Sequence, residues 1–467
     1  MALEGVWVKV GMFPSEKKSM MAFLAYIIVA TLPFPIYSFE FPGGIGMTPN
    51  NLLAIFFAPF IVLNFVKNRS IPNFTIIAWL HGLFICISFV GVLTAMVDEW
   101  VAFRGTLAYV IEYFIVYLVV FTCLKSREEI ETALKVLIVV TIINSLMGWI
   151  ELFGFMLFGK MLMPPFASYF KELSYKNFGY GTGGLGIPGF VRMFGFLGPG
   201  ADDLGSFTMF GLGAAMYFKE VTGKFFYKFT YWFFILTIIG GMSRNAFAGL
   251  LLMFLVYHVL KLDGKYAYRQ LFLKIMAFTS MISLVVLIFY FAKDATFFQD
   301  TSVHLSSTKE VQSYALLVER LNPFVSKSFS KSKDYFTTHF DLALKYGFYN
   351  LGFGLGNQNF DEYIFDNYPI KYGSHSNFIQ TLGDEGIWGL LVQLVIIILI
   401  MRFCILASFI NRDGKKDLLP VVFVASFMGI MATGLIRTYY YNPYTFVLQA
   451  MIMVLYLQKI KEKNLLK

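Results

Sequence analysis

One histidine and a small set of arginines have the residue types and spacing for chemistry on an anionic substrate. His375 lies in Gly373-Ser-His-Ser-Asn377, between the glycine-rich stretch Gly352-Phe-Gly-Leu-Gly356 and an apolar run that opens with Gly386-Ile-Trp-Gly389. A helix is expected to begin near Asn377, with Ser376 as its cap, and the positive end of its dipole would lower the pKa of the imidazole. Because a neutral imidazole suits a general base, His375 is the candidate catalytic residue.

Four arginines fall where cations are not expected, at the outer ends of apolar runs or in the outer loops. They are Arg192, Arg244, Arg320 and Arg437. An arginine near the hydrocarbon boundary is costly unless it is paired or functional, and its planar fork suits a phosphate group. Ion pairing with Asp202 or Asp203 is the alternative for Arg192, and reaching to the interface is the alternative for Arg437. We therefore expect an anion site built from arginines, with Asn377, Arg437 and Tyr439 as supporting or acceptor-side residues.

The elements that must position these residues are membrane helices. Of the 467 residues, 57% are hydrophobic and only 14% are charged. A bilayer requires apolar runs of about 20 residues, and about twelve such runs occur. They lie at about 20–39, 50–66, 74–96, 102–123, 131–157, 203–218, 225–242, 245–261, 271–292, 386–409, 418–437 and 442–458. The sequence thus predicts an all-α polytopic membrane protein with about twelve transmembrane helices.

The distribution of charge predicts which ends of these helices are cytoplasmic. Alternate short loops are rich in lysine and arginine, as in Lys125 and Arg127 or Lys415 and Lys416, whereas the short loops between them carry acidic residues such as Asp98. By the positive-inside rule both termini are cytoplasmic. The net charge of +9 then reflects loop topology and contact with anionic lipids, and no nucleic-acid partner is expected.

Two long segments fall on the outer side and divide the chain. We expect residues 1–292 to form nine transmembrane helices with an outer loop near 158–202, residues 293–385 to form an extracytoplasmic helical loop, and residues 386–467 to form three more spans. Within the large loop, Ser307–Glu310 has the pattern of a capping box. A second amphipathic pattern, which uses Phe336, Phe340, Ala343 and Leu344, ends at Gly347. The large loop is therefore expected to be a helical cap on the outer membrane surface.

Other signals are weaker or point to packing. Gly181–Gly186 matches GxGxxG, but no βαβ unit surrounds it, so a close-packed loop is the better interpretation. Glu112 lies inside a span and is expected to pair with another helix rather than to couple protons. Cys86, Cys123 and Cys404 all lie in or beside apolar runs and are expected to pack. No metal motif is present, so neither a metal nor a cofactor is expected.

Three stretches resemble the O-antigen ligase and polymerase superfamily of bacterial envelope glycan assembly. They are Arg192-Met-Phe-Gly195 leading into Gly198-Pro-Gly200, Met242-Ser-Arg-Asn245, and the series from Gly352 through His375-Ser-Asn377 to Gly389. The likeness covers roughly residues 190–440. This chain departs from the family pattern at Ser376, which separates the His and Asn, and at Pro199-Gly200, where the family commonly has Pro-Asn.

The resemblance implies a GT-C-like, inverting, metal-independent membrane glycosyltransferase. Its donor would be an undecaprenyl-pyrophosphate-linked glycan at the outer face of the bacterial inner membrane, and its other partners an acceptor glycan, membrane lipids and a chain-length regulator. By the same resemblance, Arg192 and Arg244 bind the pyrophosphate, Arg320 is a third ligand, and His375 deprotonates the acceptor hydroxyl.

Three functions remain open from the sequence. Chain length and loop size favour a repeat-unit polymerase, and a ligase that transfers finished glycan to lipid A-core is the alternative within the family. A flippase or secondary transporter is disfavoured, because transporters place their polar residues around a midplane site, whereas here they gather at one membrane face.

Overall fold

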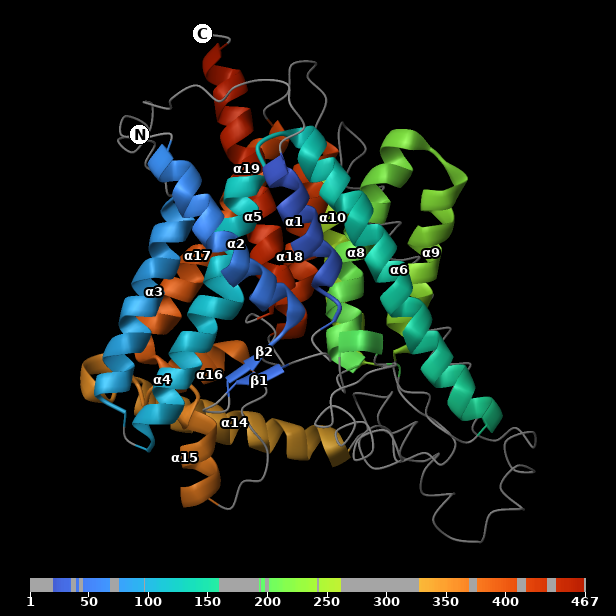
Figure 1. The fold of residues 1–467 in the computed structure, drawn as a ribbon. Coiled ribbons are helices and arrows are strands. Elements are labelled where there is room, and N and C mark those ends of the chain that lie inside the picture. The colour runs from blue at the N-terminus through green and yellow to red at the C-terminus, as the bar shows by residue number, and fades with distance from the viewer. Residues whose placement is uncertain are drawn as a thin grey trace, which may run out of the picture.

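The computed structural model describes most of the chain as a bundle of near-parallel helices (Figure 1). The described residues are 20–34, 39–41, 45–67, 75–95, 97–158, 193, 195–197, 201–241, 243–261, 327–368, 376–409, 417–434 and 442–465. The bundle helices are α1 (Met20–Thr31), α2 (Pro49–Lys67), α3 (Ile76–Leu93), α4 (Glu99–Ala108), α5 (Ile115–Cys123), α6 (Arg127–Phe158), α8 (Ala201–Thr222), α9 (Phe225–Gly240), α10 (Arg244–Lys261), α17 (Gly386–Phe409), α18 (Leu418–Gly434) and α19 (Pro443–Leu465).

The remaining described elements are short or lie at one end of the bundle. They are β1 (Phe39–Phe41), β2 (Ile45–Met47), the π-helix η2 (Tyr109–Phe114), the 3-10 helices η3 (Gly195–Leu197) and η4 (Asn350–Gly352), α14 (Lys327–Gly347), α15 (Asn359–Asn367) and α16 (Asn377–Asp384). The two strands pair antiparallel, with Phe39 opposite Met47. Apart from this small ribbon the described residues are helical or in turns, which agrees with the predicted all-α class.

Several bundle helices have the length and composition to cross a membrane. Among the described residues, four long apolar stretches meet both requirements: Ile76–Leu93, Glu99–Cys123, Arg127–Gly154 and Gly386–Ser408. Shorter apolar helices accompany them at Met21–Thr31, Pro49–Leu63, Phe225–Gly240, Asn245–Lys261 and Leu418–Gly434. The chain is thus compatible with a polytopic membrane protein, and the count of twelve spans stays a prediction. The run at 271–292 lies outside the described residues.

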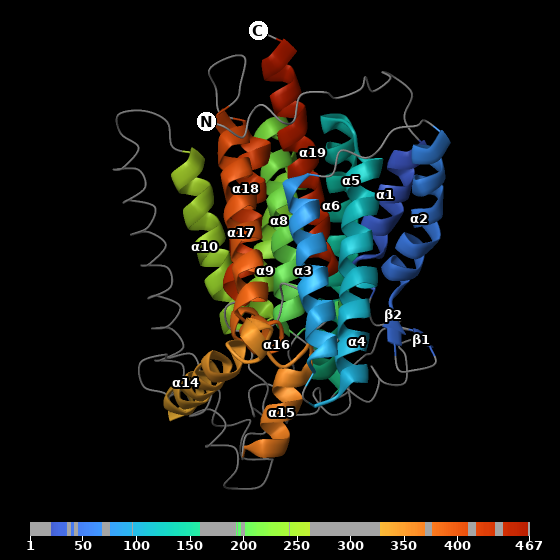
Figure 2. The same cartoon turned by 90° about the vertical axis from the view of Figure 1, so that its left-hand side faces the viewer.

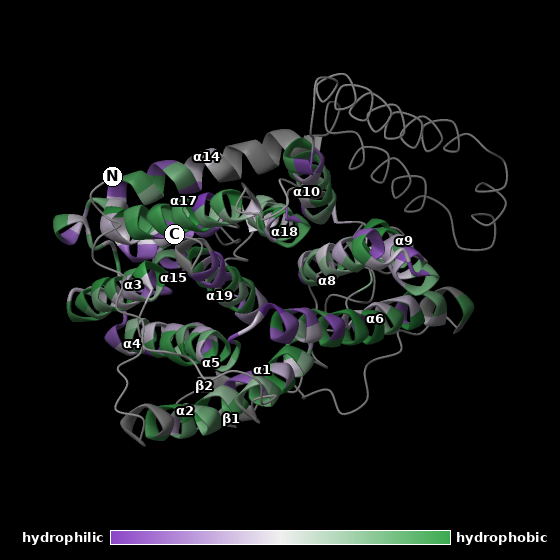
Figure 3. Ribbon diagram, turned by 90° about the horizontal axis from the view of Figure 1, so that it is seen from above, coloured by the Kyte–Doolittle hydropathy of each residue, from purple (hydrophilic) through white to green (hydrophobic). Residues whose placement is uncertain are grey.

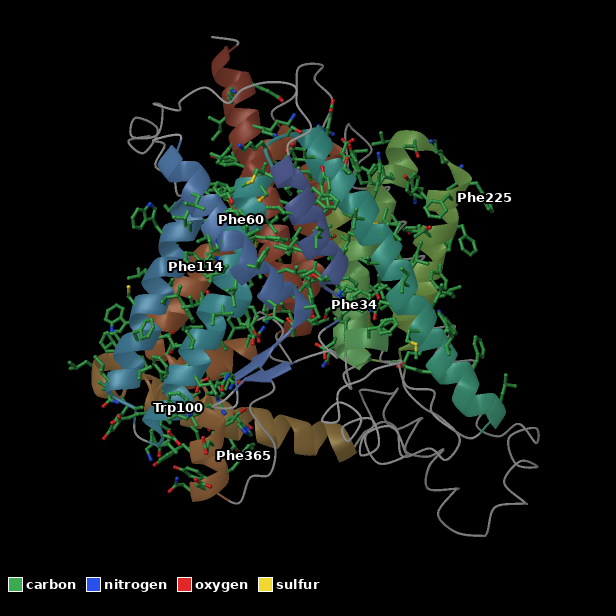
Figure 4. All side chains as sticks on the ribbon, viewed as in Figure 1. Phe34, Phe60, Trp100, Phe114, Phe225 and Phe365 are labelled. Carbon is green, nitrogen blue, oxygen red and sulfur yellow. The ribbon has the colours of Figure 1, made fainter. Side chains whose placement is uncertain are left out.

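The bundle is apolar on its outside as well as in its core. Helix α19 lies in the interior among α5, α17 and α18 (Figure 3), and nearly all of α18 is buried. On the outside, aromatic side chains such as Phe60 and Phe225 are exposed and point away from the bundle (Figure 4). An apolar exterior of this extent is unfavourable in water and favourable in contact with lipid.

The two ends of the bundle differ in what they carry. Helix α1 begins and α19 ends at one end, whereas α14, α15, α16 and the β-ribbon lie at the other (Figures 1 and 2). Under the charge-based topology, the end with α14–α16 is the outer end. Helices α4, α8, α10 and α17 all have their N-termini there, because each runs from that end toward the other (Figure 2).

A buried ion network closes the opposite end. Asp417, just before α18, accepts hydrogen bonds from Arg127 Nη1 at 2.7 Å and Nη2 at 3.1 Å, and Lys459 Nζ lies 3.0 Å from the same carboxylate. Tyr217 of α8 extends this network: its hydroxyl accepts a hydrogen bond from Arg127 Nη2 and donates one to Glu131 Oε1. Burial alone would raise the pKa of Asp417, but the hydrogen bonds and positive charge of Arg127 outweigh it and hold the pKa below its ordinary value. The network therefore fixes α6, α8, α18 and α19 to one another.

Candidate functional site

The glycine-rich stretch Gly352–Gly356, which we call the glycine clasp, is packed against the junction of α16 and α17. Leu355 N donates to Gly383 O at 3.0 Å, and Gly356 N donates to Asp384 O at 2.9 Å. Gly354 has φ +73°, and a Cβ there would lie 2.6 Å from both Asp384 O and Gly386 N. The glycines are needed because two backbones approach this closely.

The other side of the clasp docks on the turn between α3 and α4. Asn350 Nδ2 donates to Thr94 O at 2.9 Å, and Asn359 Nδ2 donates to Asp98 O at 3.2 Å. At the same contact, a Cβ on Gly91 of α3 would lie 3.5 Å from the Cα of Gly356. The clasp thus joins the start of α17 to the outer ends of α3 and α4.

Helix α16 begins at Asn377, as predicted, and its first turn is buried. Ser376 occupies the N-cap position with φ −135° and ψ 127°, but its side chain makes no capping hydrogen bond. Ser376 is therefore at the expected N-cap position, but the structure shows no capping bond from its side chain. The Asn377 side chain is buried, and its Oδ1 has no hydrogen-bond partner in the described structure. A buried carbonyl oxygen without a donor is costly, so Asn377 is suited to accept a bond from a substrate hydroxyl.

Two buried carboxyl groups at the end of α16 were not singled out from the sequence. Asp384 Oδ1 accepts a 2.8 Å bond from Phe360 N and so caps the N-terminus of α15 from another helix. Burial raises the pKa of Asp384 well above its usual range. Burial, followed by the charge of Asp384, raises the pKa of the neighbouring Glu385 as well. The sequence signal was the run Gly383-Asp-Glu-Gly386 at the start of an apolar helix.

Arg104 is a second residue that the sequence reasoning missed. It lies in α4, inside the candidate span Glu99–Cys123, and is only partly exposed. Within the described ranges its guanidinium makes no ion pair or hydrogen bond. Its neighbour Gly105 faces the loop after the clasp, where a Cβ would lie 2.7 Å from Asn357 Oδ1. An arginine inside a span that lacks a partner among the described residues indicates a function. Arg104 is such a residue, and it is adjacent to Gly105, which faces the loop after the clasp.

The Ser-Arg element begins α10 at the outer end of the bundle. Ser243 is buried, and its Oγ accepts a 3.1 Å bond from Ala246 N, while its carbonyl accepts a 3.0 Å bond from Phe247 N. Ser243 is therefore the N-cap, and Arg244 is the first helical residue. The backbone of Arg244 thus lies at the positive end of a helix dipole; its side chain is not among those described.

The turn after Arg192 is held against α6. Gly195 N donates to Glu151 Oε2 and Phe196 N donates to Asn144 Oδ1, each at 2.8 Å. Gly195 has φ +63°, and a Cβ there would lie 2.5 Å from Asn144 Oδ1. A glycine is therefore needed at the end of the Arg-Met-Phe-Gly stretch, because it allows the backbone of this turn to approach α6 closely.

Several predicted site residues lie outside the described residues, so the structure gives them no contacts. They are Arg192, Arg320, His375, Arg437 and Tyr439. The same holds for the GxGxxG pattern at 181–186 and for the capping box at 307–310.

Two polar residues inside the bundle have partners within the protein. Both ring nitrogens of the buried His81 are bonded, Nδ1 to Tyr109 OH and Nε2 to Gln449 Oε1, each at 2.9 Å. This gives His81 a packing role. Glu112 lies in the π-helix η2, and its hydrogen-bond partner among the described residues is the adjacent Tyr113. Within the described ranges, the expected pairing of Glu112 with another helix is not observed.

Comparison with known proteins agrees with the motifs. None of the curated proteins matches the sequence. Residues 229–394 match the family model described as O-antigen ligase. The matched range runs from within α9 to within α17, so it contains the Ser243–Arg244 start of α10, the glycine clasp and α16. The match supports a membrane enzyme of the O-antigen ligase and polymerase type. The predicted resemblance is thereby confirmed: over residues 229–394 the chain is similar to the O-antigen ligase family.

Proposed function

We propose that the protein is a membrane glycosyltransferase that transfers undecaprenyl-pyrophosphate-linked glycan to a glycan acceptor, most simply as a repeat-unit polymerase. The observation that carries the proposal is the family match over residues 229–394, which covers the capped start of α10 and the clasp with α16. Under this proposal the enzyme is of the GT-C type and lies in the bacterial inner membrane with both termini cytoplasmic. Residues 293–385 form its extracytoplasmic helical part.

The donor pyrophosphate would be held by arginines at the outer end of the bundle. Arg244 at the start of α10 supports this assignment, as does Arg104 in α4, which has no partner among the described residues; Arg192 and Arg320 complete the proposed set. Fixed guanidinium groups stabilise the charge that develops on a pyrophosphate leaving group, and they need no reorganisation when it forms. The proposed step requires neither a metal nor a cofactor.

The proposed reaction is a single displacement. The acceptor hydroxyl oxygen attacks the anomeric carbon, the bond from that carbon to the pyrophosphate oxygen breaks, and undecaprenyl pyrophosphate leaves with the electron pair. His375 takes the hydroxyl proton, with Asn377, Arg437 and Tyr439 on the acceptor side. Attack from the face opposite the leaving group inverts the anomeric centre.

The proposal is tested by substituting the two assigned halves of the site separately. His375→Ala and Arg244→Ala should each abolish long-chain glycan while the protein remains folded in the membrane. Arg402→Ala is a matched control, since Arg402 is an exposed cation toward the opposite end of α17. Normal glycan in either site variant would contradict the site assignment, and loss in the control variant would show a general effect of removing a cation.

A ligase that transfers finished glycan to lipid A-core is the second candidate, and the description of the matching family favours it. A strain that lacks the protein separates the two. Single repeats on lipid A-core identify a polymerase, whereas polymer retained on undecaprenyl pyrophosphate identifies a ligase. Unchanged glycan with altered transport of the lipid-linked unit would instead favour a flippase.

A further inference from the structure

Helix α14 has two apolar faces, and only one of them packs against the protein. Leu342, Ala343 and Tyr346 belong to a buried cluster that includes Leu382 of α16, and Gly347 lies against Leu382 with no room for a side chain. His339 is buried on the same face. The sequence pattern grouped Phe340 and Leu344 with Ala343 on one amphipathic face, and the structure leaves these two exposed on the side of the helix next to the packed face.

The second face forms an apolar stripe that no described residue covers. Phe340, Leu344 and Phe348 follow one another at intervals of four residues and are 43%, 39% and 61% exposed. The stripe continues to Leu351, which is 91% exposed, and ends at Trp388 in the first turn of α17. We call these five residues the α14 stripe. Such a surface is unfavourable in water.

The exposed end of the α14 stripe is held in place by a strained turn. Leu351 has φ 59° and ψ 25°, a left-handed conformation that is disfavoured for a residue with a side chain. Trp388 Nε1 donates to Leu351 O at 3.0 Å, which fixes this turn to the start of α17. The structure thus holds a leucine outward beside a tryptophan at the end of a candidate span. Tryptophan at such a position is typical of the membrane interface.

The surface that continues the α14 stripe indicates what covers it. Leu391, Val395 and Ile398 on the next turns of α17 are exposed, within the candidate span Gly386–Ser408. Trp388 belongs to both this face and the α14 stripe. Helix α14 lies across the outer end of the bundle and along its flank, beside α17 and α10 (Figures 1 and 3). Lipid that contacts α17 therefore also reaches the stripe.

We propose that α14 lies in the outer leaflet, with the α14 stripe inserted below the lipid headgroups and the polar side, including Thr338, facing water. The hydrophobic stripe and polar opposite face are those of an interfacial helix. Because α14 packs on α16, the bilayer then sets the height of Asn377 at the start of α16. If the proposed function is correct, this holds Asn377 at the level of the lipid pyrophosphate.

The insertion is tested on the full-length chain in vesicles of phosphatidylethanolamine and phosphatidylglycerol. With Cys86 replaced by Ser, single cysteines at Phe348, Leu351, Thr338 and Phe365 carry an environment-sensitive fluorophore. Thr338 is exposed on the polar side of α14, and Phe365, which is 45% exposed, is an aromatic residue on α15, which extends away from the end of the bundle (Figure 2). Each site is quenched either by lipid bearing a nitroxide just below its headgroup or by aqueous iodide.

Lipid nitroxide should quench labels at 348 and 351 at least about threefold more than labels at 338 and 365, and iodide should show the reverse order. Equal lipid quenching at 348 and 338, or strong iodide quenching at 351, would overturn the proposal. Because strain at Leu351 could perturb its variant, Phe348→Cys against Phe365→Cys is the deciding pair. The measurement needs no catalysis, so it stands or fails independently of the proposed glycan transfer.

Discussion

Substituting Gly354 by alanine tests whether the glycine clasp positions the site. The new Cβ would lie 2.6–2.7 Å from three backbone atoms of the α16–α17 junction, namely Asp384 O, Gly386 N and Gly383 O, and φ there is +73°. A left-handed residue with a side chain costs about 1–2 kcal/mol, and overpacking against atoms that cannot rotate away costs about 1–3 kcal/mol. The clasp should therefore be destabilised by about 2–5 kcal/mol.

The matched control is Gly223→Ala, between α8 and α9. Gly223 has φ +64°, yet a Cβ there would meet nothing within 4 Å. Gly223→Ala therefore has the conformational cost of about 1–2 kcal/mol but no cost from steric overlap. Comparing the two variants, each in the segment that contains its substitution, separates the effect of close packing from that of backbone strain.

The assay is amide hydrogen exchange on the purified protein, followed in peptides from 350–368 and 376–390. A loss of 2–5 kcal/mol corresponds to local opening that is about 30-fold to a few thousandfold more frequent, since each 1.4 kcal/mol is tenfold. The bundle helices should keep their protection, and glycan transfer should fall. If Gly354→Ala exchanges like wild type in these peptides, as Gly223→Ala should, the clasp does not hold the junction and the reasoning is refuted.

Three further predictions concern charged residues. Asp417→Asn removes the carboxylate that the buried Lys459 and the partly exposed Arg127 share, while Glu462 and Glu131 remain beside them, and should lower stability by about 1.5–3 kcal/mol in thermal unfolding; exposed Glu128→Gln is the control, and equal melting of the two would contradict it. Because the pKa of Asp417 is lowered, its contribution is present above the ordinary value and is lost as pH falls through the lowered one. Burial raises the pKa of Asp384, so the folded protein binds that proton more tightly than the unfolded chain does, and stability should fall as pH rises from the ordinary value through the raised one. Asp384→Asn should flatten this dependence in pH-resolved proteolysis of the 353–385 region, and an unchanged profile would rule the effect out. Arg104→Ala should slow glycan transfer by about 100-fold, and Arg104→Lys by less, because lysine keeps the charge without the fork; a wild-type rate in Arg104→Ala would remove it from the site.

Features governed by local pattern were predictable from the sequence. Helix α16 begins at the predicted Asn377 and α14 ends at the predicted Gly347, because the apolar periodicity and the residue preferences of helix ends involve only a few neighbouring residues. The apolar runs likewise predicted the bundle, since the length of a span is set by the bilayer. The family resemblance was visible in the order of short motifs.

Features that depend on distant contacts were not predictable. The glycine clasp was recognisable in the sequence as a glycine-rich stretch, but its role comes from backbone contacts with Gly383, Asp384 and the α3–α4 turn, the last about 250 positions away in sequence. Asp384 could be recognised as a cap only once α15 was placed beside it. Arg104 became informative because the described residues around it supply no acceptor, and only a three-dimensional arrangement shows that.

The sequence by itself predicted a helical membrane protein, and its resemblance to the O-antigen ligase family is supported over residues 229–394. Hydrophobicity, charge placement and helix ends depend on residues that are neighbours in the sequence, so they can be predicted without a three-dimensional structure. The tertiary structure decided what those motifs do. In the structure the glycines of the clasp are closely packed between other backbone segments, and one face of α14 is left exposed. Neither feature could be predicted from local sequence, because each depends on contacts between elements that are far apart in the chain.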